Sequence, residues 1–428
     1  MRSNKDTVFA LATPKFKSAI AVLRITGNKS FKVIKGLTKI KNNTKKPKLT
    51  QISDNKKNII DEVLITFFKS PKSYTGEDLV EISCHGSVAI INKISQTLLD
   101  KGLRTAEPGE FTKRALLNNK MNMLQAESVN DLIGAETENQ RKRAINNLSG
   151  GLEKYLNSIL TKLSKLLADI EAIIDFSDEE LPKKLLSKIK EQKRNIIKDL
   201  SKKLSSSRLS NHIHSGFKIM IIGKPNTGKS SFINFISDRE ISIVTNIPGT
   251  TTDLVSSNLE IGGDKYVFID SAGIRKHKNK IEKIGIQKTL ESSENSDLNL
   301  VFLERNETSL YKKIDKKIFI RSKYDINKTK TSNIHNISSK TGHGIKGLLK
   351  KIQKMVSNNY IELNTFSRER HIRSIEKALI LLRNINFNSI DTASEDVRMC
   401  YKELQQINQT FEIEKILDII FSDFCIGK

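Results

Sequence analysis

At 428 residues the chain is long enough for roughly three domains, and its 73 lysines and arginines against 48 acidic residues give a formal charge of +25 and a pI near 9.7. Its three cysteines, Cys84, Cys400 and Cys425, have neither the spacing of a disulfide framework nor that of a zinc site, which favours a reducing compartment. No apolar run approaches the roughly 18 residues of a membrane span, and the N-terminus lacks the pattern of a signal peptide, so we expect a cytoplasmic protein with no membrane partner.

The excess of positive charge has two interpretations. It can attract a polyanion, of which RNA is the natural candidate. It can also reflect a compositional bias of the source genome, because the basic residues are spread along the chain beside many asparagines and isoleucines. The charge is consistent with nucleic-acid binding and does not establish it.

The first part of the chain, residues 1–118, alternates short β-type runs with helical periodicity, which predicts an α+β domain. The β-type runs lie at 7–12, 19–25, 62–68 and 78–83, and the helical ones at 31–37 and 88–99. Three segments place charged side chains beside glycine turns, which suits a binding pocket and equally an ordinary loop: 73–78, 81–86 and 107–115.

Residues 119–210 and 358–428 are predicted to be helical and to form one discontinuous domain. Apolar residues between Leu152 and Ile174 recur with the i, i+3, i+4 spacing, so we expect them to face one core stripe. The pattern continues to Leu204 with lysines on the opposite face, which is either a solvated face or an RNA-binding one. In the second part we expect helices at 371–385, 392–407 and 412–421, the middle one opened by a capping box of Thr392 and Glu395.

Between these helical parts, residues 211–357 carry the pattern of an inserted nucleotide-binding α/β domain. Its β-type runs alternate with helical ones, at 218–222, 266–269, 298–303, 317–320 and 333–337. Such alternation predicts a parallel, doubly wound sheet whose ligand loops lie at the carboxyl ends of the strands. Because helices flank this domain on both sides in the sequence, we expect movement at the nucleotide to reach both sets of helices.

The segment 223–230 reads Gly-Lys-Pro-Asn-Thr-Gly-Lys-Ser and joins a β-type run to a helical one. This order of strand, G-x-x-x-x-G-K-S and helix is typical of a phosphate-binding loop, in which Lys229 reaches the β- and γ-phosphates and Ser230 ligates Mg²⁺. A chance glycine turn is the alternative, and the complete pattern argues against it. The expected nucleotide contacts are Asn226, Thr227, Gly228, Lys229, Ser230 and Ser231.

Two further elements suit a nucleotide switch. A hydroxyl-rich stretch can bring a threonine to the magnesium only when the γ-phosphate is present. Its expected contacts are Thr245, Asn246, Ile247, Pro248, Gly249, Thr250 and Thr251. A D-x-x-G element follows the run 266–269, and there Asp270 can hold Mg²⁺ while the Gly273 N–H approaches the γ-phosphate. Ser271 and Ala272 complete this element.

The base-reading element is Ser322-Lys323-Tyr324-Asp325, in which serine stands where N-K-x-D has asparagine. Asp325 can accept from guanine N1 and N2, and Lys323 can cover the base. The segment Ser338-Ser339-Lys340 can supply a backbone contact to the guanine oxygen. Since buried polar recognition strongly rejects the wrong base, Asp325 predicts GTP rather than ATP. The nearby G-x-G-x-x-G match at 342–347 follows the base loop and opens a helix, so a second dinucleotide site there is disfavoured.

Together with the sequences F-C-I-G-K at 424–428, Y-T-G-E-D at 74–78 and P-G-E-F-T at 108–112, these elements resemble the MnmE (TrmE) family of tRNA modification GTPases over essentially the whole chain. These three signatures are together specific to that family, whereas the GTPase motifs are shared with many. The resemblance implies a homodimer that acts with the flavoprotein MnmG on the wobble uridine of certain tRNAs. It also implies that an aminomethyl or carboxymethylaminomethyl group is added at carbon 5, using a one-carbon unit from 5-formyltetrahydrofolate or a related tetrahydrofolate.

The same resemblance implies metal ligands and a catalytic residue. The family's K⁺ ligands correspond to Asn226, Thr245, Ile247 and Thr250, and its Mg²⁺ ligands to Ser230 and Thr251. K⁺ can take the place of an arginine finger by neutralising charge between the β- and γ-phosphates. The family's water-orienting glutamate corresponds to Glu282, which read alone is more simply a solvated helix charge.

The folate-contacting positions of the family correspond to Arg24, Glu81, Lys120 and the terminal Lys428. Cations suit the glutamyl carboxylates of a folate, and a carboxylate suits its pterin-type donors. Cys425 corresponds to the family's signature cysteine; it either has a chemical or site-lining role or is a small buried hydrophobe.

The chain departs from the family pattern at three places. Residues 14–19 replace a glycine-rich loop, Ser322 removes an amide contact to guanine at a cost of about 1 to 3 kcal/mol, and the stretch 303–318 is short for a crossover helix. Two other functions therefore stay open. One is a GTP-dependent RNA-binding or ribosome-assembly switch of the Era or Der type, and the other is a helical scaffold whose nucleotide site has decayed.

Overall fold

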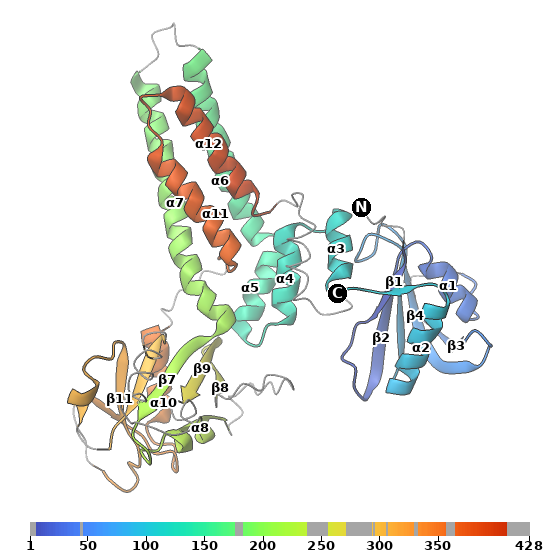
Figure 1. Cartoon of the computed structure of the whole chain (residues 1–428), viewed down its shortest axis with the longest axis horizontal. Helices are drawn as coiled ribbons and strands as arrows, with labels where there is room; N and C mark the ends of the chain where they lie inside the picture. The colour runs from blue at the N-terminus through green and yellow to red at the C-terminus, as the bar shows by residue number, and fades with distance from the viewer. Residues whose placement is uncertain are drawn as a thin grey trace, which may run out of the picture. The chain divides into compact units, whose positions relative to one another are not determined.

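The computed structural model describes residues 6–42, 46–175, 183–237, 256–270, 293, 296–304, 307–328, 333–356 and 364–408 (Figure 1). The chain divides into two compact units, one of Met1–Asn130 with Asn408–Lys428 and the other of Asp131–Ile407. The expected multidomain architecture is confirmed, because the first unit is α+β and the second combines a helical domain with an inserted α/β domain. The finer domain boundaries stay predictions. None of the described helices is both long and apolar enough to cross a membrane.

The first unit is built on a six-stranded sheet with the strand order β3-β4-β5-β2-β1-β6. Neighbouring strands of this sheet are antiparallel, except that β1 and β6 are parallel. In the described part of residues 1–120 it is accompanied by α1 (Ser30–Leu37), α2 (Val88–Asp100) and α3 (Glu110–Leu117). The strands are β1 (Val8–Leu11), β2 (Ser18–Thr26), β3 (Lys48–Ser53), β4 (Ile59–Phe68), β5 (Leu79–Gly86) and β6 (Arg104–Thr105).

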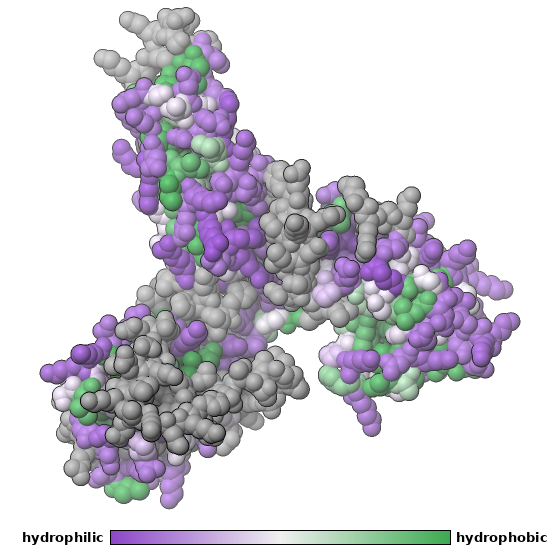
Figure 2. Space-filling view, viewed as in Figure 1, coloured by the Kyte–Doolittle hydropathy of each residue, from purple (hydrophilic) through white to green (hydrophobic). Residues whose placement is uncertain are grey.

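The two faces of this sheet are covered unequally. Buried side chains of α1 and α2 pack with Leu23, Ile82 and other residues of one face into a single core cluster. The opposite face is covered by Phe111 of α3 near β1, but farther along it Leu49 and Leu64 are paired neighbours with 68% and 40% of their surface exposed. Side chains alternate along a strand, so Leu49 and Leu64 point away from the face that α1 and α2 cover and form an exposed apolar surface. Green patches on this unit are visible in Figure 2.

The helical part of the second unit comprises α5 (Glu138–Leu148), α6 (Gly151–Asp175), α7 (Lys183–Ser215), α11 (Glu369–Asn384) and α12 (Ile390–Gln405). A further helix, α4 (Met123–Ile133), precedes it in the chain. The predicted stripe is confirmed, since the buried residues of α6 keep the expected spacing from Leu152 to Ile170. Helices α11 and α12 lie against α7 and α6 (Figure 1), so segments far apart in sequence form one helical domain.

The capping box predicted at Thr392 is wrong. Helix α12 begins at Ile390 behind Ser389, which makes no side-chain cap, and the Thr392 hydroxyl donates to the Ser389 carbonyl instead. A capping box occurs at the start of α5, where Thr137 and Gln140 exchange side-chain and backbone hydrogen bonds.

The inserted α/β domain has a six-stranded sheet with the order β12-β11-β10-β7-β9-β8. All neighbouring strands are parallel, as predicted, except β8, an antiparallel edge strand that the sequence reading missed. A single 3₁₀ turn, Thr308–Tyr311, lies between β10 and β11. Among the described residues the helices are α8 (Lys229–Ser237) and α10 (Ile345–Val356), and the strands are β7 (Phe217–Gly223), β8 (Ser256–Ile261), β9 (Asp264–Asp270), β10 (Leu298–Phe302), β11 (Lys317–Arg321) and β12 (Ile334–Asn336).

Candidate nucleotide-binding site

The loop between β7 and α8 has the backbone that a phosphate requires. Asn226 and Gly228 adopt positive φ angles of 62° and 90°, the region that asparagine tolerates and glycine favours. A Cβ atom at Gly228 would lie 2.5 Å from the Ser322 Oγ, so the close approach of these two loops also requires glycine. The loop therefore reaches α8 with its N–H groups at a helix N-terminus, where anions bind.

Lys229 holds the inside of this loop. Its ammonium group donates to the Gly223 carbonyl at 2.8 Å and to the Lys224 carbonyl at 2.7 Å, and the residue is only 6% exposed. The Thr227 hydroxyl also donates to the Lys224 carbonyl, at 2.8 Å. The lysine is thus held where it can exchange carbonyl partners for phosphate oxygens.

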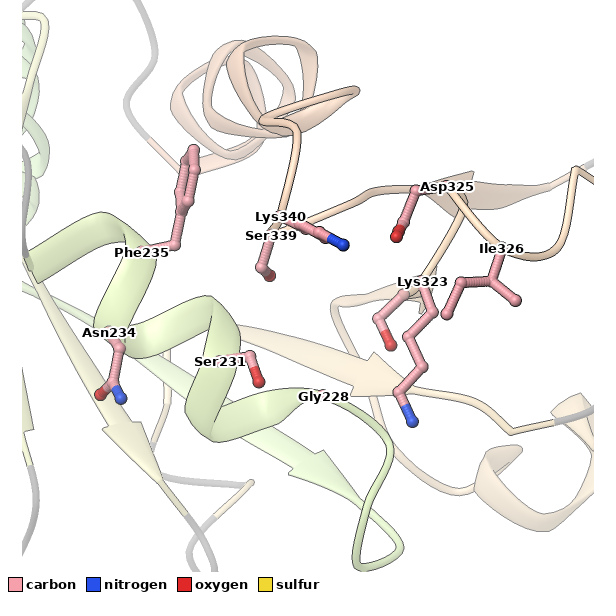
Figure 3. Close-up of a pocket in the computed structure, with 10 residues that line it drawn as sticks. Gly228, Ser231, Asn234, Phe235, Lys323, Asp325, Ile326, Ser339 and Lys340 are labelled. Carbon is pink, nitrogen blue, oxygen red and sulfur yellow. The ribbon is translucent and has the colours of Figure 1, made fainter.

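Beside the loop lies a cavity of about 530 Å³ (Figure 3). It is lined by Gly228 of the phosphate loop, by helix α8, and by the loops that follow β11 and β12 of the parallel sheet. Ligand sites of such sheets lie at the carboxyl ends of the strands. The lining residues are Gly228, Ser231, Asn234, Phe235, Ser322, Lys323, Asp325, Ile326, Ser339 and Lys340.

Asp325 is prepared to accept hydrogen bonds from a base. The Ser338 hydroxyl donates to its Oδ1 at 2.7 Å, and this bond, helped by the charge of Lys340, lowers the pKa of Asp325. The carboxylate is therefore ionised at neutral pH and keeps Oδ2 for donors on a ligand. Figure 3 shows Asp325, Ser339 and Lys340 around the same space.

The loops that follow β11 and β12, which we call the base loops, are also joined by two stacked rings. Tyr324 and His343 are stacked with centroids 4.8 Å apart and an interplanar angle of 15°, and the Ser338 N–H donates to the His343 carbonyl at 3.0 Å. Gly344 has a φ of +74° and lies against the backbone of Asn336, just before α10 begins. The glycine match at 342–347 thus shapes a turn behind the base loop.

Ser322 hydrogen-bonds to the phosphate loop, a contact that the sequence did not predict. Its hydroxyl donates to the Thr227 carbonyl at 2.6 Å, and the neighbouring Lys323 ammonium donates to the Asn226 carbonyl at 3.3 Å. The base loop is therefore tied to the phosphate loop at two adjacent residues. Only the structure could show this, because the two segments are 95 residues apart.

The remaining predicted nucleotide residues are only partly described. Asp270 ends β9 opposite Ile221 of β7 and is 6% exposed, which places it beside the strand that feeds the phosphate loop. Ser230 and Ser231 belong to the first turn of α8. Outside the described residues lie 245–251, 271–273, Glu282, Cys425 and Lys428.

In the first unit, two of the predicted folate contacts meet. Arg24 and Glu81 are paired neighbours on β2 and β5, and the Arg24 Nε donates to the Glu81 Oε1 at 2.8 Å with both side chains about a quarter exposed (23% and 28%). Lys120 lies against Gly76, where a Cβ atom would be 3.1 Å from the Lys120 Cγ. A cation and a carboxylate of this kind suit a ligand with both acidic groups and N–H donors.

A buried ionic network near this pair was also missed. The Arg114 guanidinium, almost fully buried, donates to Glu110 at 2.8 Å and to Glu77 at 3.1 Å, and Arg104 also binds Glu110 at 2.8 Å. The network joins the P-G-E-F-T and Y-T-G-E-D segments. The sequence showed only charged side chains beside glycine turns, and this pattern does not reveal which arginine pairs with which glutamate.

Comparison with known proteins identifies the family. A family model described as the MnmE helical domain matches residues 123–425, and one described as the GTP-binding protein TrmE N-terminus matches residues 7–120. The chain belongs to the MnmE family. The "tRNA modification GTPase MnmE" of Rickettsia bellii (strain RML369-C) is 38% identical over 99% of this chain and 100% of its own length. That of Pelagibacter ubique (strain HTCC1062) is 39% identical with the same coverage.

Among solved structures, the G domain of the T. maritima FeoB iron transporter is 22% identical and covers 33% of this chain and 99% of its own, with a TM-score of 0.26.

Proposed function

We propose that this chain hydrolyses GTP as part of an enzyme that modifies tRNA. The observation that carries this proposal is the joined phosphate and base site, in which Lys229 and Asp325 lie on loops tied by Ser322. Membership of the MnmE family, whose relatives are named tRNA modification GTPases, supports it. The described residues that follow the nucleotide domain, 364–408, form α11 and α12, which argues against the RNA-binding KH fold of an Era-type switch.

The base site favours guanine. Asp325 is a hydrogen-bond acceptor held ionised by Ser338, and guanine offers N1 and N2 donors where adenine offers an acceptor at N1. Adenine would leave the carboxylate without its donors, and such a mismatch of buried polar groups is heavily penalised. The hydroxyl of Ser322 is occupied by Thr227, so base selection rests on Asp325 and the 338–340 loop.

Two described residues support the expected metal ions. Ser230 and Asn226 are exposed at the open end of the phosphate loop and offer oxygen ligands, which hard cations prefer. We assign Mg²⁺ to Ser230 and Thr251, and K⁺ to Asn226, Thr245, Ile247 and Thr250. These ions would neutralise charge that develops on the β- and γ-phosphates. Glu282 is proposed to orient the attacking water.

We further propose that the first unit binds 5-formyltetrahydrofolate or a related one-carbon tetrahydrofolate. Arg24, Glu81 and Lys120 supply the cations and the carboxylate that such a ligand needs, and the terminal Lys428 would add a further cation. Cys425 is proposed to line or act in the same site. The one-carbon unit would be used, with the flavoprotein MnmG, to place an aminomethyl or carboxymethylaminomethyl group at C5 of the wobble uridine.

The active form is proposed to be a cytoplasmic homodimer formed through the first unit. The exposed apolar residues Leu49 and Leu64, with Ile20 at 62% exposure, form a surface of the kind that subunit interfaces bury. A self-complementary sheet face is suited to a twofold interface.

Two measurements test the proposal. Phosphate release from GTP and from ATP is followed in KCl and in NaCl, and we expect turnover of GTP that is stimulated by K⁺. Wobble nucleosides are quantified by mass spectrometry in cells lacking the gene, where we expect the modified uridines to disappear. Turnover without K⁺ stimulation would contradict the ion assignment, and unchanged nucleosides would contradict the role in tRNA modification.

A further inference from the structure

The β8–β9 hairpin joins the nucleotide site to the opposite end of the sheet. Strand β9 ends at Asp270, which can also hold Mg²⁺, and begins at Asp264 beside the hairpin turn. Six residue steps along a strand span about 20 Å. In the sequence, β8 follows the predicted switch stretch 245–251 after a few residues. One hairpin therefore connects Asp270, and in the sequence also the predicted switch stretch, to the Gly262–Gly263 turn.

That turn docks on the first turn of α5 in the helical domain. The Asn139 backbone N–H donates to the Gly263 carbonyl at 3.1 Å, and its side-chain Nδ2 donates to the Asp264 Oδ1 at 2.9 Å and to the Gly262 carbonyl at 3.4 Å. The first N–H groups of a helix have no partner within the helix. Here one of them binds the nucleotide domain.

An ion pair and a buried carboxylate strengthen the contact. Lys265 pairs with Glu136, with side chains only 16% and 23% exposed. Asp264 is 3% exposed, and its burial, with the charge of Glu260, raises its pKa despite the hydrogen bond from Asn139. A carboxylate in such surroundings is costly without a donor, so Asn139 has a specific partner to satisfy.

The turn also has the glycine that this approach needs. Gly263 has a φ of +89°, and a Cβ there would lie 2.9 Å from the Asn139 Cγ. Asn139 therefore packs against bare backbone as well as hydrogen-bonding to it.

Helix α7 also meets the sheet, at β7 and at β9, where Gly216 lies against Val267 and Lys265. Helix α7 enters β7 through Gly216, at the end of that strand away from the phosphate loop. The returning segment is held by Arg143, Lys203 and Ser207 at residues 364–366, after α10. The hairpin turn itself is held by the hydrogen bonds of Asn139 and by the ion pair of Lys265 with Glu136.

We propose that Asn139 is a positioning residue that transmits the nucleotide state from Asp270 through the β8–β9 hairpin to α5. The proposal rests on the function proposed above and adds the route by which hydrolysis reaches the helical domain. Asn139 does not touch the nucleotide, so its loss uncouples tRNA modification from hydrolysis without stopping hydrolysis.

The test uses the full chain with Asn139→Ala and, as a matched control, Asn157→Ala on the exposed side of α6. Hydrogen exchange of the α5 amides is measured with GDP and with the non-hydrolysable analogue guanosine 5′-(β,γ-imido)triphosphate. In the wild type and in Asn157→Ala we expect α5 exchange to differ between the two nucleotides. In Asn139→Ala we expect that difference to vanish, GTP turnover to stay within about twofold, and modified wobble uridine in complemented cells to fall at least about fivefold, the lower range of allosteric coupling.

A second pair of variants guards against simple misfolding. Asp264→Asn keeps an oxygen acceptor for Asn139 and should behave as the wild type, whereas Asp264→Ala should reproduce Asn139→Ala. The proposed coupling is overturned by any of three results. Hydrogen exchange of α5 in the wild type is the same with both nucleotides, Asn139→Ala keeps the wild-type level of modified uridine, or Asp264→Asn loses as much modified uridine as Asp264→Ala. Absence of GTP turnover in the wild type, or unchanged uridines in the deletion strain, would instead overturn the proposed function itself and the coupling with it.

Discussion

Replacing Ser322 by alanine should weaken the binding of GTP and of GDP to the same extent. The substitution removes the 2.6 Å hydrogen bond to the Thr227 carbonyl, on a residue that is 5% exposed. A neutral hydrogen bond contributes about 0.5 to 1.5 kcal/mol net, and a buried carbonyl left unpaired costs about 1 to 3 kcal/mol. Since Ser322 is only half-buried and water can reach the gap, we expect a loss near 1 kcal/mol, or about fivefold in Kd.

The effect should appear in binding because the nucleotide bridges the two loops that Ser322 ties together. In the proposed site its phosphates bind the loop of Lys229 and its base binds Asp325, so a prior tie reduces the ordering cost of association. The tie does not reach the γ-phosphate, which is why GTP and GDP should weaken together.

Titration with fluorescent GDP and GTP analogues measures both constants, and Ser309→Ala, an exposed serine of the same domain, is the matched control. An unchanged Kd for Ser322→Ala would refute the tie as a binding element. A loss confined to GTP would also refute it, because it would place Ser322 near the γ-phosphate.

Three further predictions follow from the same contacts. Asp325→Asn should bind guanine nucleotides more weakly and xanthine nucleotides more tightly, since xanthine has a carbonyl at C2 that can accept a hydrogen bond from the new amide. Competition binding with guanine and xanthine nucleotides measures both changes. Gly228→Ala should weaken GTP at least about tenfold, because alanine at a φ of 90° is strained by about 1 to 3 kcal/mol and its Cβ would meet Ser322; calorimetric titration measures the loss, and binding at wild-type strength would contradict the loop geometry. For Glu110, burial opposes ionisation but hydrogen bonds from Arg104 and Arg114 prevail and lower the pKa below its usual 4.5, so its stabilisation is present above that pH and is lost as the pH falls. Glu110→Gln should cost about 1.5 to 3 kcal/mol at pH 7 and progressively less as the pH falls below 4.5, which a series of urea melts over this range would show; a loss that does not change with pH would rule out the ionic role.

The sequence predicted the elements whose signal is local. The phosphate loop needs a strand, two glycines and Lys229 in one short stretch, and the helical stripe from Leu152 follows from spacing along one helix. Strand β8 was missed because its residues, 256–261, mix polar and apolar side chains at an edge of the sheet. The capping box at Thr392 failed because a motif of two residues is too weak to fix where α12 begins.

What the sequence could not supply is the pairing of polar side chains across long separations. Ser322 looked like a defect in the base motif, and only its contact with Thr227 shows that it ties two loops. Arg114 and Glu77 stand in separate segments of the sequence, and Asn139 had no apparent partner until the hairpin turn was placed beside it. Apolar residues can exchange partners at small cost, so periodicity alone predicts where they face. A buried polar group needs one particular partner, and that partner is set by the tertiary structure. The contacts that carry the proposed GTP binding and coupling are therefore those that a linear pattern conceals, because each of them joins a loop or turn to a distant segment.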